Sequence, residues 1–205
     1  MEIENATKRR IREQALKLIC ANGFENVTLS DICEASGVNK HTFYYYFKAK
    51  ADLLKQYYQI PHQLDALDLA SIFTNDSYVE QLWLLRKNIL DFSAGAGTVI
   101  IKQLLIKNLL DDIGTFVISE EGRHLRQLQK NILEKGQSGG EVLCQTEADL
   151  LLLLLDQSVY STIFSWAVKN GSFNLYDATR YMFERILMVV PERRKMLTYE
   201  FHEIL

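Results

Sequence analysis

The chain has 205 residues, of which 48% are hydrophobic and 24% charged, and its formal net charge is -3. This composition is typical of a soluble globular protein of one or two domains, and it excludes a disordered or fibrous class. The charge is divided unevenly, because residues 1–60 carry nine Lys/Arg and seven Asp/Glu, whereas the remainder carries fourteen and nineteen. The resulting charges of +2 and -5 favour a polyanionic partner for the N-terminal part.

The composition also bears on location and chemistry. Three cysteines without C-x-x-C spacing predict neither a disulfide framework nor a zinc site, and they fit a reducing cytoplasm. The start of the chain lacks the apolar core of a signal peptide, and the leucine run 150–155 lies between two aspartates, so we expect no membrane partner. Metal-ligand spacing and catalytic motifs are missing, so we predict no metal, no cofactor and no enzymatic activity.

A first helix is predicted from about residue 4 to residue 22. Ile11, Ala15, Leu18 and Ile19 recur at helical spacing and form one apolar side, and Gly23 follows as a stop signal. Basic residues near its start fit two roles equally well, a contact with DNA phosphates or the minor groove and an ordinary solvated helix face. They are Lys8, Arg9, Arg10 and Arg12.

Thr28 is predicted to cap a second, short helix, because a hydroxyl before an apolar run can accept hydrogen bonds from the first backbone amides. Leu29, Ile32 and Cys33 give this helix a single apolar stripe. Cys33, and likewise Cys20 in the first helix, is therefore expected in a small core. Gly37 ends the helix, since glycine adopts the left-handed conformation of many C-caps.

A third helix follows directly, from about Asn39 to Phe47. Phe43, Tyr46 and Phe47 fall on one side and are expected to face the core. The opposite side can then donate hydrogen bonds to base edges in a major groove, although two-helix corners also occur in proteins that do not bind DNA. Its candidate DNA contacts are His41, Tyr44, Tyr45 and Lys48, flanked by Lys40 and Thr42.

The run GVNKHTFYYYFKAKADLL resembles the helix-turn-helix signature of the TetR family of bacterial transcriptional regulators, whose usual form is G-V-S-K-G-T-L-Y-x-Y-F-x-x-K-E-x-L. The resemblance implies that Lys40, Thr42, Tyr44 and Tyr45 approach bases and phosphates. It also implies that Thr28 and Lys48 bind phosphates. Asn39 stands where serine is common and His41 where small residues are common, and both departures concern which operator is read.

The middle of the chain is predicted to be helical throughout. A bridging helix occupies about 48–60, a helix capped by Asp76 or Ser77 runs to Phe92, glycines at 95 and 97 interrupt, and helices follow at 99–110 and 120–135. In the family that the chain resembles, this region binds small inducers. The candidate ligand contacts are Trp83, Phe92, Phe116 and Tyr160.

Two helices near the end carry surplus apolar surface. One runs from Glu147 to about Lys169, with Thr146 and Asp149 resembling a capping box, and the other runs from the cap Asn174 to Val190. A helix that is apolar nearly all round is buried on two sides, which favours a four-helix interface between two subunits, although both helices could simply be core. The candidate dimer contacts are Leu152, Val159, Phe164, Tyr181 and Val189.

KGQSGGEV and SWAVKNGSFNL resemble motifs around the eighth helix of the same family. We therefore predict an all-α protein with a helix-turn-helix domain at 1–48, a bridging helix at about 48–60, and a helical ligand-binding and dimerisation domain at 61–205. The leading hypothesis is a cytoplasmic, homodimeric repressor that a small-molecule inducer releases from a near-palindromic operator. The alternative is a DNA-binding protein of the same fold without a ligand, controlled by a partner protein or acting architecturally.

Overall fold

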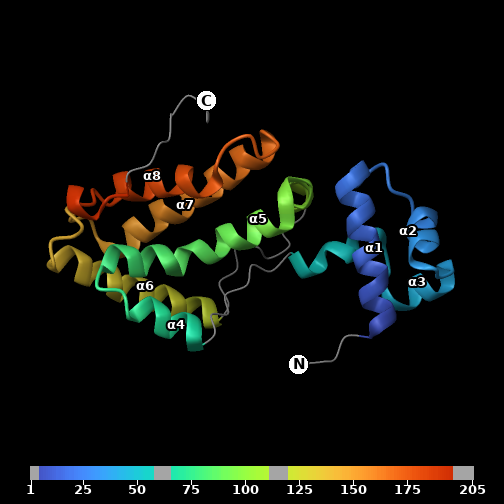
Figure 1. Cartoon of the computed structure of the whole chain (residues 1–205), viewed down its shortest axis with the longest axis horizontal. Helices are drawn as coiled ribbons and strands as arrows, with labels where there is room; N and C mark the ends of the chain where they lie inside the picture. Colours follow the sequence, from blue (N-terminus) through green and yellow to red (C-terminus); the bar gives the residue numbers. More distant parts are fainter. Residues whose placement is uncertain (1–4, 58–65, 111–119, 196–205) are drawn as a thin grey trace. The chain divides into compact units, whose positions relative to one another are not determined.

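The computed structural model describes residues 5–57, 66–110 and 120–195, which form an all-α protein as predicted (Figure 1). Within these ranges the only β pairing is an isolated antiparallel bridge between Val142 and Val189. The helices, in chain order, are α1 Ala6–Asn22, α2 Leu29–Ser36, α3 Lys40–Tyr46, the 3-10 helix η1 Lys50–Tyr57, α4 Ala66–Phe73, α5 Tyr78–Leu110, α6 Glu120–Ser138, α7 Ala148–Val168, α8 Leu175–Ile186 and the 3-10 helix η2 Pro191–Arg193.

The chain divides into two compact units. The first, here called the head unit, holds α1, α2, α3 and η1 together with the residues of α5 from Val99 onward. In it, α1 packs against α2 and η1, and α2 packs against α3 (Figure 1). Ile11, Ala15 and Ile19 are fully buried, so the apolar stripe of α1 faces the core.

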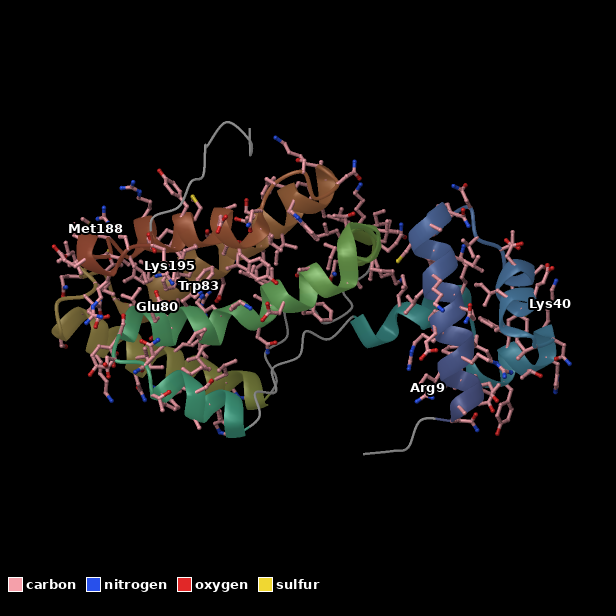
Figure 2. The ribbon with its side chains drawn as sticks, in the orientation of Figure 1. Arg9, Lys40, Glu80, Trp83, Met188 and Lys195 are labelled. Atoms are coloured by element: carbon pink, nitrogen blue, oxygen red, sulfur yellow. The ribbon has the colours of Figure 1, made fainter. Side chains whose placement is uncertain are left out.

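The second, here called the bundle unit, holds α4, the residues of α5 up to Thr98, and α6 to α8. α7 packs against both α6 and α8, and Leu151, Leu152 and Leu155 lie in its core. A buried ion pair joins Glu80 of α5 to Arg180 of α8. Figure 2 shows Glu80 and Trp83 of α5 beside Lys195, whose ammonium lies 3.2 Å from the Glu80 carboxylate.

α5 is one long helix with a break in its backbone geometry. At Gly97 the backbone has φ 78° and ψ 161°, which lies outside the helical region and is accessible almost only to glycine. The predicted interruption at Gly97 is confirmed, whereas the predicted helix end at Phe92 and the interruption at Gly95 are wrong, because α5 continues through both positions. Ser77 caps the start of α5, because its hydroxyl oxygen accepts a hydrogen bond from the Glu80 amide at 3.3 Å.

α5 and α7 are long and apolar enough to span a membrane, by length and composition alone. Each contributes one partner to an ion pair in which the Arg86 guanidinium lies 2.5 Å from the Asp156 carboxylate. Ionised side chains are rare in membrane spans, and here the pair lies between helices of one bundle. We therefore interpret both as core helices of a bundle.

The bridging helix predicted at about 48–60 is observed as the 3-10 helix Lys50–Tyr57, and its predicted end lies outside the described residues. The Asp52 carboxylate accepts a hydrogen bond from the Ala49 amide at 2.9 Å near the start of this helix. The predicted capping box before α7 is wrong. Thr146 and Asp149 form no capping box, because the N-cap is Glu147 and Asp149 instead pairs with Lys130.

The end predicted for α8 is wrong. The helix stops at Ile186 rather than continuing to Val190. Met188 adopts a positive φ of 51°, and Val190 then donates a backbone hydrogen bond to Glu141 at 3.1 Å. The chain leaves the helix there because backbone groups of residues 141–144 compete for its hydrogen bonds.

Candidate DNA-binding surface

α2 begins with the cap that the sequence predicts. The Thr28 hydroxyl accepts from the Asp31 amide at 3.2 Å, and the Asp31 carboxylate accepts from the Thr28 amide at 2.7 Å. The Thr28 amide also lowers the pKa of Asp31, so this carboxylate stays ionised at the positive end of the helix dipole. Thr28 is exposed and keeps its hydroxyl hydrogen free to donate outward.

The turn between α2 and α3 depends on two residues. Gly37 adopts the left-handed conformation at φ 61° and ψ 38°, and its amide donates to Glu34 at 3.1 Å. Asn39 then caps α3, because its side-chain oxygen accepts from the Thr42 amide at 2.8 Å and from the Thr42 hydroxyl at 3.1 Å. Asparagine thus supplies the cap that serine supplies in the usual signature.

The residues predicted as DNA contacts lie on the accessible side of this corner. Lys40, His41 and Lys48 are exposed, and Tyr45 is the most open of the aromatic residues that the structure describes, with 78% of its surface accessible. Tyr44 is exposed too, and Thr42 is half-buried against Asn39. Figure 2 shows Lys40 pointing away from α1, and the exposure of its neighbours shows that this face carries accessible donors.

The opposite side of α3 anchors the corner. Phe43 is fully buried and Phe47 nearly so, with their ring centroids 5.4 Å apart, whereas Tyr46 is only half-buried. Cys33 is buried as predicted. The prediction that Cys20 lies in the core is wrong, because it is exposed near the end of α1, one residue beyond the buried Ile19.

Lys50 fixes the loop that precedes α2, a role that the sequence did not indicate. Its ammonium donates to the carbonyl oxygens of Phe24 at 2.6 Å and Val27 at 2.9 Å, and it lies 4.1 Å from the centre of the Phe24 ring. These contacts join residues 23 and 26 positions apart in the chain. Lys50 therefore acts as a positioning residue for Thr28, whereas Lys48 makes no hydrogen bond or ion pair with any residue that the structure describes.

Replacing Lys50 by alanine is expected to destabilise the head unit by about 1.5–3 kcal/mol, the usual contribution of hydrogen bonds to a charged group. Lys48→Ala is the matched control, since it removes an exposed lysine two positions away without breaking an interaction with a described residue. Chemical unfolding followed by circular dichroism measures both variants. Equal stability of the two would contradict the positioning role of Lys50.

Of the candidate ligand contacts, only Trp83 lines a cavity that the structure describes. Trp83 lines a small cavity between α5, α7 and α8. Phe92 and Tyr160 are half-buried and do not belong to that lining. Burial, with Asp156 nearby, raises the pKa of Tyr160, so its hydroxyl stays protonated at neutral pH. Phe116 lies outside the described residues.

Three candidate dimer contacts have no free surface. Leu152 and Val189 are fully buried in their own subunit, and Val159 is nearly so. These assignments are corrected, because an all-apolar helix does not show from its sequence which side its own subunit covers. Phe164, which is 50% exposed, and the half-buried Tyr181 remain predicted contacts.

A match to a known protein family covers the same helix-turn-helix region. Residues 11–57 match the family model described as "Bacterial regulatory proteins, tetR family". The match therefore begins at the first core residue of α1 and ends with η1, so it contains the capped α2, the Gly37 turn and the outward face of α3. This helix-turn-helix region matches the tetR family. The resemblance seen in the sequence is thereby confirmed, and so is the division into a helix-turn-helix region and a larger helical part.

Longer matches extend over most of the chain. The "Probable acrEF/envCD operon repressor" of Escherichia coli strain K12 is 20% identical over 197 residues, covering 91% of this chain and 88% of that protein. Thermus thermophilus FadR, a TetR-family transcriptional repressor solved with lauroyl-CoA, has a TM-score of 0.54 at 20% identity, covering 94% of this chain and all of that one.

A Saccharomonospora viridis protein described as a candidate transcriptional regulator, solved with choline, has a TM-score of 0.59. It is 19% identical to this chain, with 87% of this chain and 94% of that chain covered. At such identities the structures show a shared fold. The bundle unit therefore shares its helical fold with these structures.

Proposed function

We propose that this chain is a cytoplasmic repressor that binds a near-palindromic operator as a homodimer and is released by a small molecule. The observation that carries the proposal is the outward face of α3, which presents donors on a helix anchored from behind by Phe43. A helix of this kind fits a major groove with its first turns toward the base edges. The repressor role is supported by the operon repressor that the chain resembles over most of its length.

We assign separate roles to the exposed residues. His41, Thr42, Tyr44 and Tyr45 are positioned to meet bases, with the Thr42 oxygen free to accept while its hydrogen points to Asn39. Thr28 and Lys48 lie at the two ends of the corner and are assigned to phosphates, together with Lys40 at the first turn of α3. The phosphate contacts set affinity, and the base contacts set which operator is read.

Lys48→Ala is expected to weaken binding about equally for operator and scrambled DNA and to reduce the salt dependence by about one ion, since it removes a phosphate contact. His41→Ala should instead reduce the preference for operator over scrambled DNA by about 1–3 kcal/mol. Fluorescence anisotropy with both duplexes at several salt concentrations measures these effects. The assignment fails if both variants lose discrimination equally.

The homodimer is supported by the outer face of α7. At about 100° per residue its exposed apolar residues fall on one side, opposite the side that packs on α6 and α8. Isolated apolar residues are common on surfaces, but several on one side of a helix indicate a covered face, even though the exposed polar residues Gln157 and Ser161 lie among them. These exposed apolar residues, here called the stripe, are Leu150, Leu153, Leu154, Phe164 and Val168.

The small number of base pairs that one helix-turn-helix contacts also supports a dimer. A single helix-turn-helix contacts only a few base pairs, and two of them bind half-sites about 34–36 Å apart or a multiple of that distance. The two subunits would then share one two-fold axis with the DNA. This is why the operator is proposed to be nearly palindromic.

The similar structures solved with lauroyl-CoA and with choline support control by a small molecule. The cavity beside Trp83 is a candidate site, but it has room for only about 10 Å³, roughly one water molecule. The small size of this cavity favours the second candidate function, a regulator of the same fold without a ligand. Screening small molecules for release of operator DNA separates the two, because the second candidate predicts no release by any of them.

A further inference from the structure

Two arginines of the bundle unit are buried, and each leaves one N–H group without a hydrogen-bond partner among the described residues. These groups are the Nε of Arg86 and one terminal nitrogen of Arg180. An unpaired buried donor is costly, so each calls for an explanation. The two arginines differ in the charges that surround them.

The cluster around Arg180 is neutral. Arg180 pairs with Glu80 and with Glu184, whose carboxylate lies 2.6 Å from the guanidinium, and Lys195 pairs with Glu80 at 3.2 Å. Two cations thus face two carboxylates. This cluster has no electrostatic need for a further anion.

The cluster around Arg86 has an excess positive charge. Arg86 and Arg126 both donate to the single carboxylate of Asp156, and the other acceptor of Arg86 is the neutral side chain of Gln129 at 3.1 Å. Two cations therefore share one anion. Burial lowers the pKa of Arg86 although Asp156 opposes that shift, which is the expected consequence of an incompletely compensated buried cation.

Arg86 also forms part of the wall of the small cavity. The rest of the wall is largely apolar, and it comes from α5, α7 and α8. One cation with a spare donor in an apolar wall is the combination that binds an amphipathic anion. The other lining residues are Trp83, Leu90, Leu155, Ser158, Val159, Thr179 and Phe183.

We propose that this cavity opens to bind a small organic acid, whose carboxylate accepts hydrogen bonds from Arg86 and whose apolar part packs against Trp83 and Phe183. The inference rests on the proposed function as a ligand-released regulator and specifies its ligand class. A cationic ligand would add to the excess charge, and a purely apolar ligand would leave the spare donor unpaired.

A ligand larger than water must separate the helices that Arg86 holds together. Arg86 joins α5 to α7 through Asp156 and to α6 through Gln129, so a carboxylate that engages Arg86 alters both connections. α5 continues from this site through the break at Gly97 to residues that belong to the head unit. The site therefore lies on the helix whose later residues belong to the head unit.

The first test measures binding of butyrate, hexanoate and octanoate to the full-length protein by calorimetry and tryptophan fluorescence. Hexanol and hexylammonium serve as neutral and cationic controls of similar length. Hexanoate is expected to bind at least about tenfold more tightly than either, the equivalent of one charge-assisted hydrogen bond. Equal affinity for hexanol, or no binding of any carboxylate, would overturn the proposal.

Variants then locate the site. Arg86→Gln should lower hexanoate affinity about tenfold or more, while Arg185→Gln, which changes an exposed arginine of α8, should leave it unchanged. If Arg86→Gln fails to fold, Ser158→Leu tests the same cavity from α7 by filling it, and it should also abolish binding. Unaltered affinity in a folded Arg86→Gln or in Ser158→Leu would refute the site.

Release of operator DNA separates this inference from the function on which it rests. Binding of hexanoate that depends on Arg86 without DNA release supports the site and contradicts the ligand-released repressor. Release by neutral or cationic molecules, with no binding of carboxylates, supports that repressor and contradicts the site. Release by hexanoate that is lost in Arg86→Gln supports both.

Discussion

Phe164→Glu is expected to produce a folded monomer that binds its operator about 100-fold more weakly than the wild type, the lower range of what linking two binding modules contributes. Phe164 is half-exposed on the outer stripe of α7. A carboxylate there would lose its hydration when two subunits pack their stripes together, and burying an unpaired charge costs several kcal/mol. Within the free subunit the same side chain remains in water, so folding should be retained.

Phe73→Glu is a closely matched control for this experiment. Phe73 has the same chemistry and an exposed fraction of 49%, compared with 50% for Phe164, but it lies on α4 rather than on α7 (Figure 1). Sedimentation velocity and anisotropy with a full palindromic operator measure assembly and DNA binding. The dimer model fails if Phe164→Glu is monomeric yet binds the full operator at wild-type affinity, or if it remains dimeric.

The head unit could be predicted from the sequence because its signals are local. Thr28 and Asn39 each cap the helix that follows within three residues, and Gly37 takes the backbone conformation for which glycine is suited. The side of α3 that carries Phe43 follows from helical periodicity alone. The role of Lys50 could not be predicted, because its partners lie 23 and 26 residues away and are backbone carbonyls, which leave no mark in the sequence.

The bundle unit was less predictable because its helices are apolar on more than one side. Along α7, leucines at 152 and 155 face the core and leucines at 150 and 153 face outward, and no difference in chemistry separates them. Long-range ion pairs are also hidden, since Arg86 and Asp156 lie 70 residues apart in the chain. The sequence therefore indicates that α7 has surplus apolar surface, but it does not show that Leu152 and Val159 of α7, and Val189 beyond α8, are buried.

Arg180→Ala is expected to destabilise the bundle unit by about 3–5 kcal/mol, the usual cost of removing one partner from a buried ion pair. From the sequence, Arg180 and Glu184 look like an ordinary surface pair at i and i+4. In the structure the arginine is 2% exposed, and its guanidinium lies 5.1 Å from the Trp83 ring centre and 5.4 Å from that of Phe183. Its loss would leave the buried Glu184 carboxylate without a cation.

Urea unfolding of two further variants distinguishes a lost ion pair from general damage to α8. Arg185→Ala removes a neighbouring exposed arginine that lies 5.1 Å from the Tyr181 ring centre, and such a contact contributes about 0.5–1 kcal/mol. Arg180→Met combined with Glu184→Met removes both charges while keeping apolar volume, so it should recover most of the stability that Arg180→Ala loses. A double variant as unstable as Arg180→Ala would show that lost packing on Trp83 and Phe183, rather than the unpaired carboxylate, accounts for the effect.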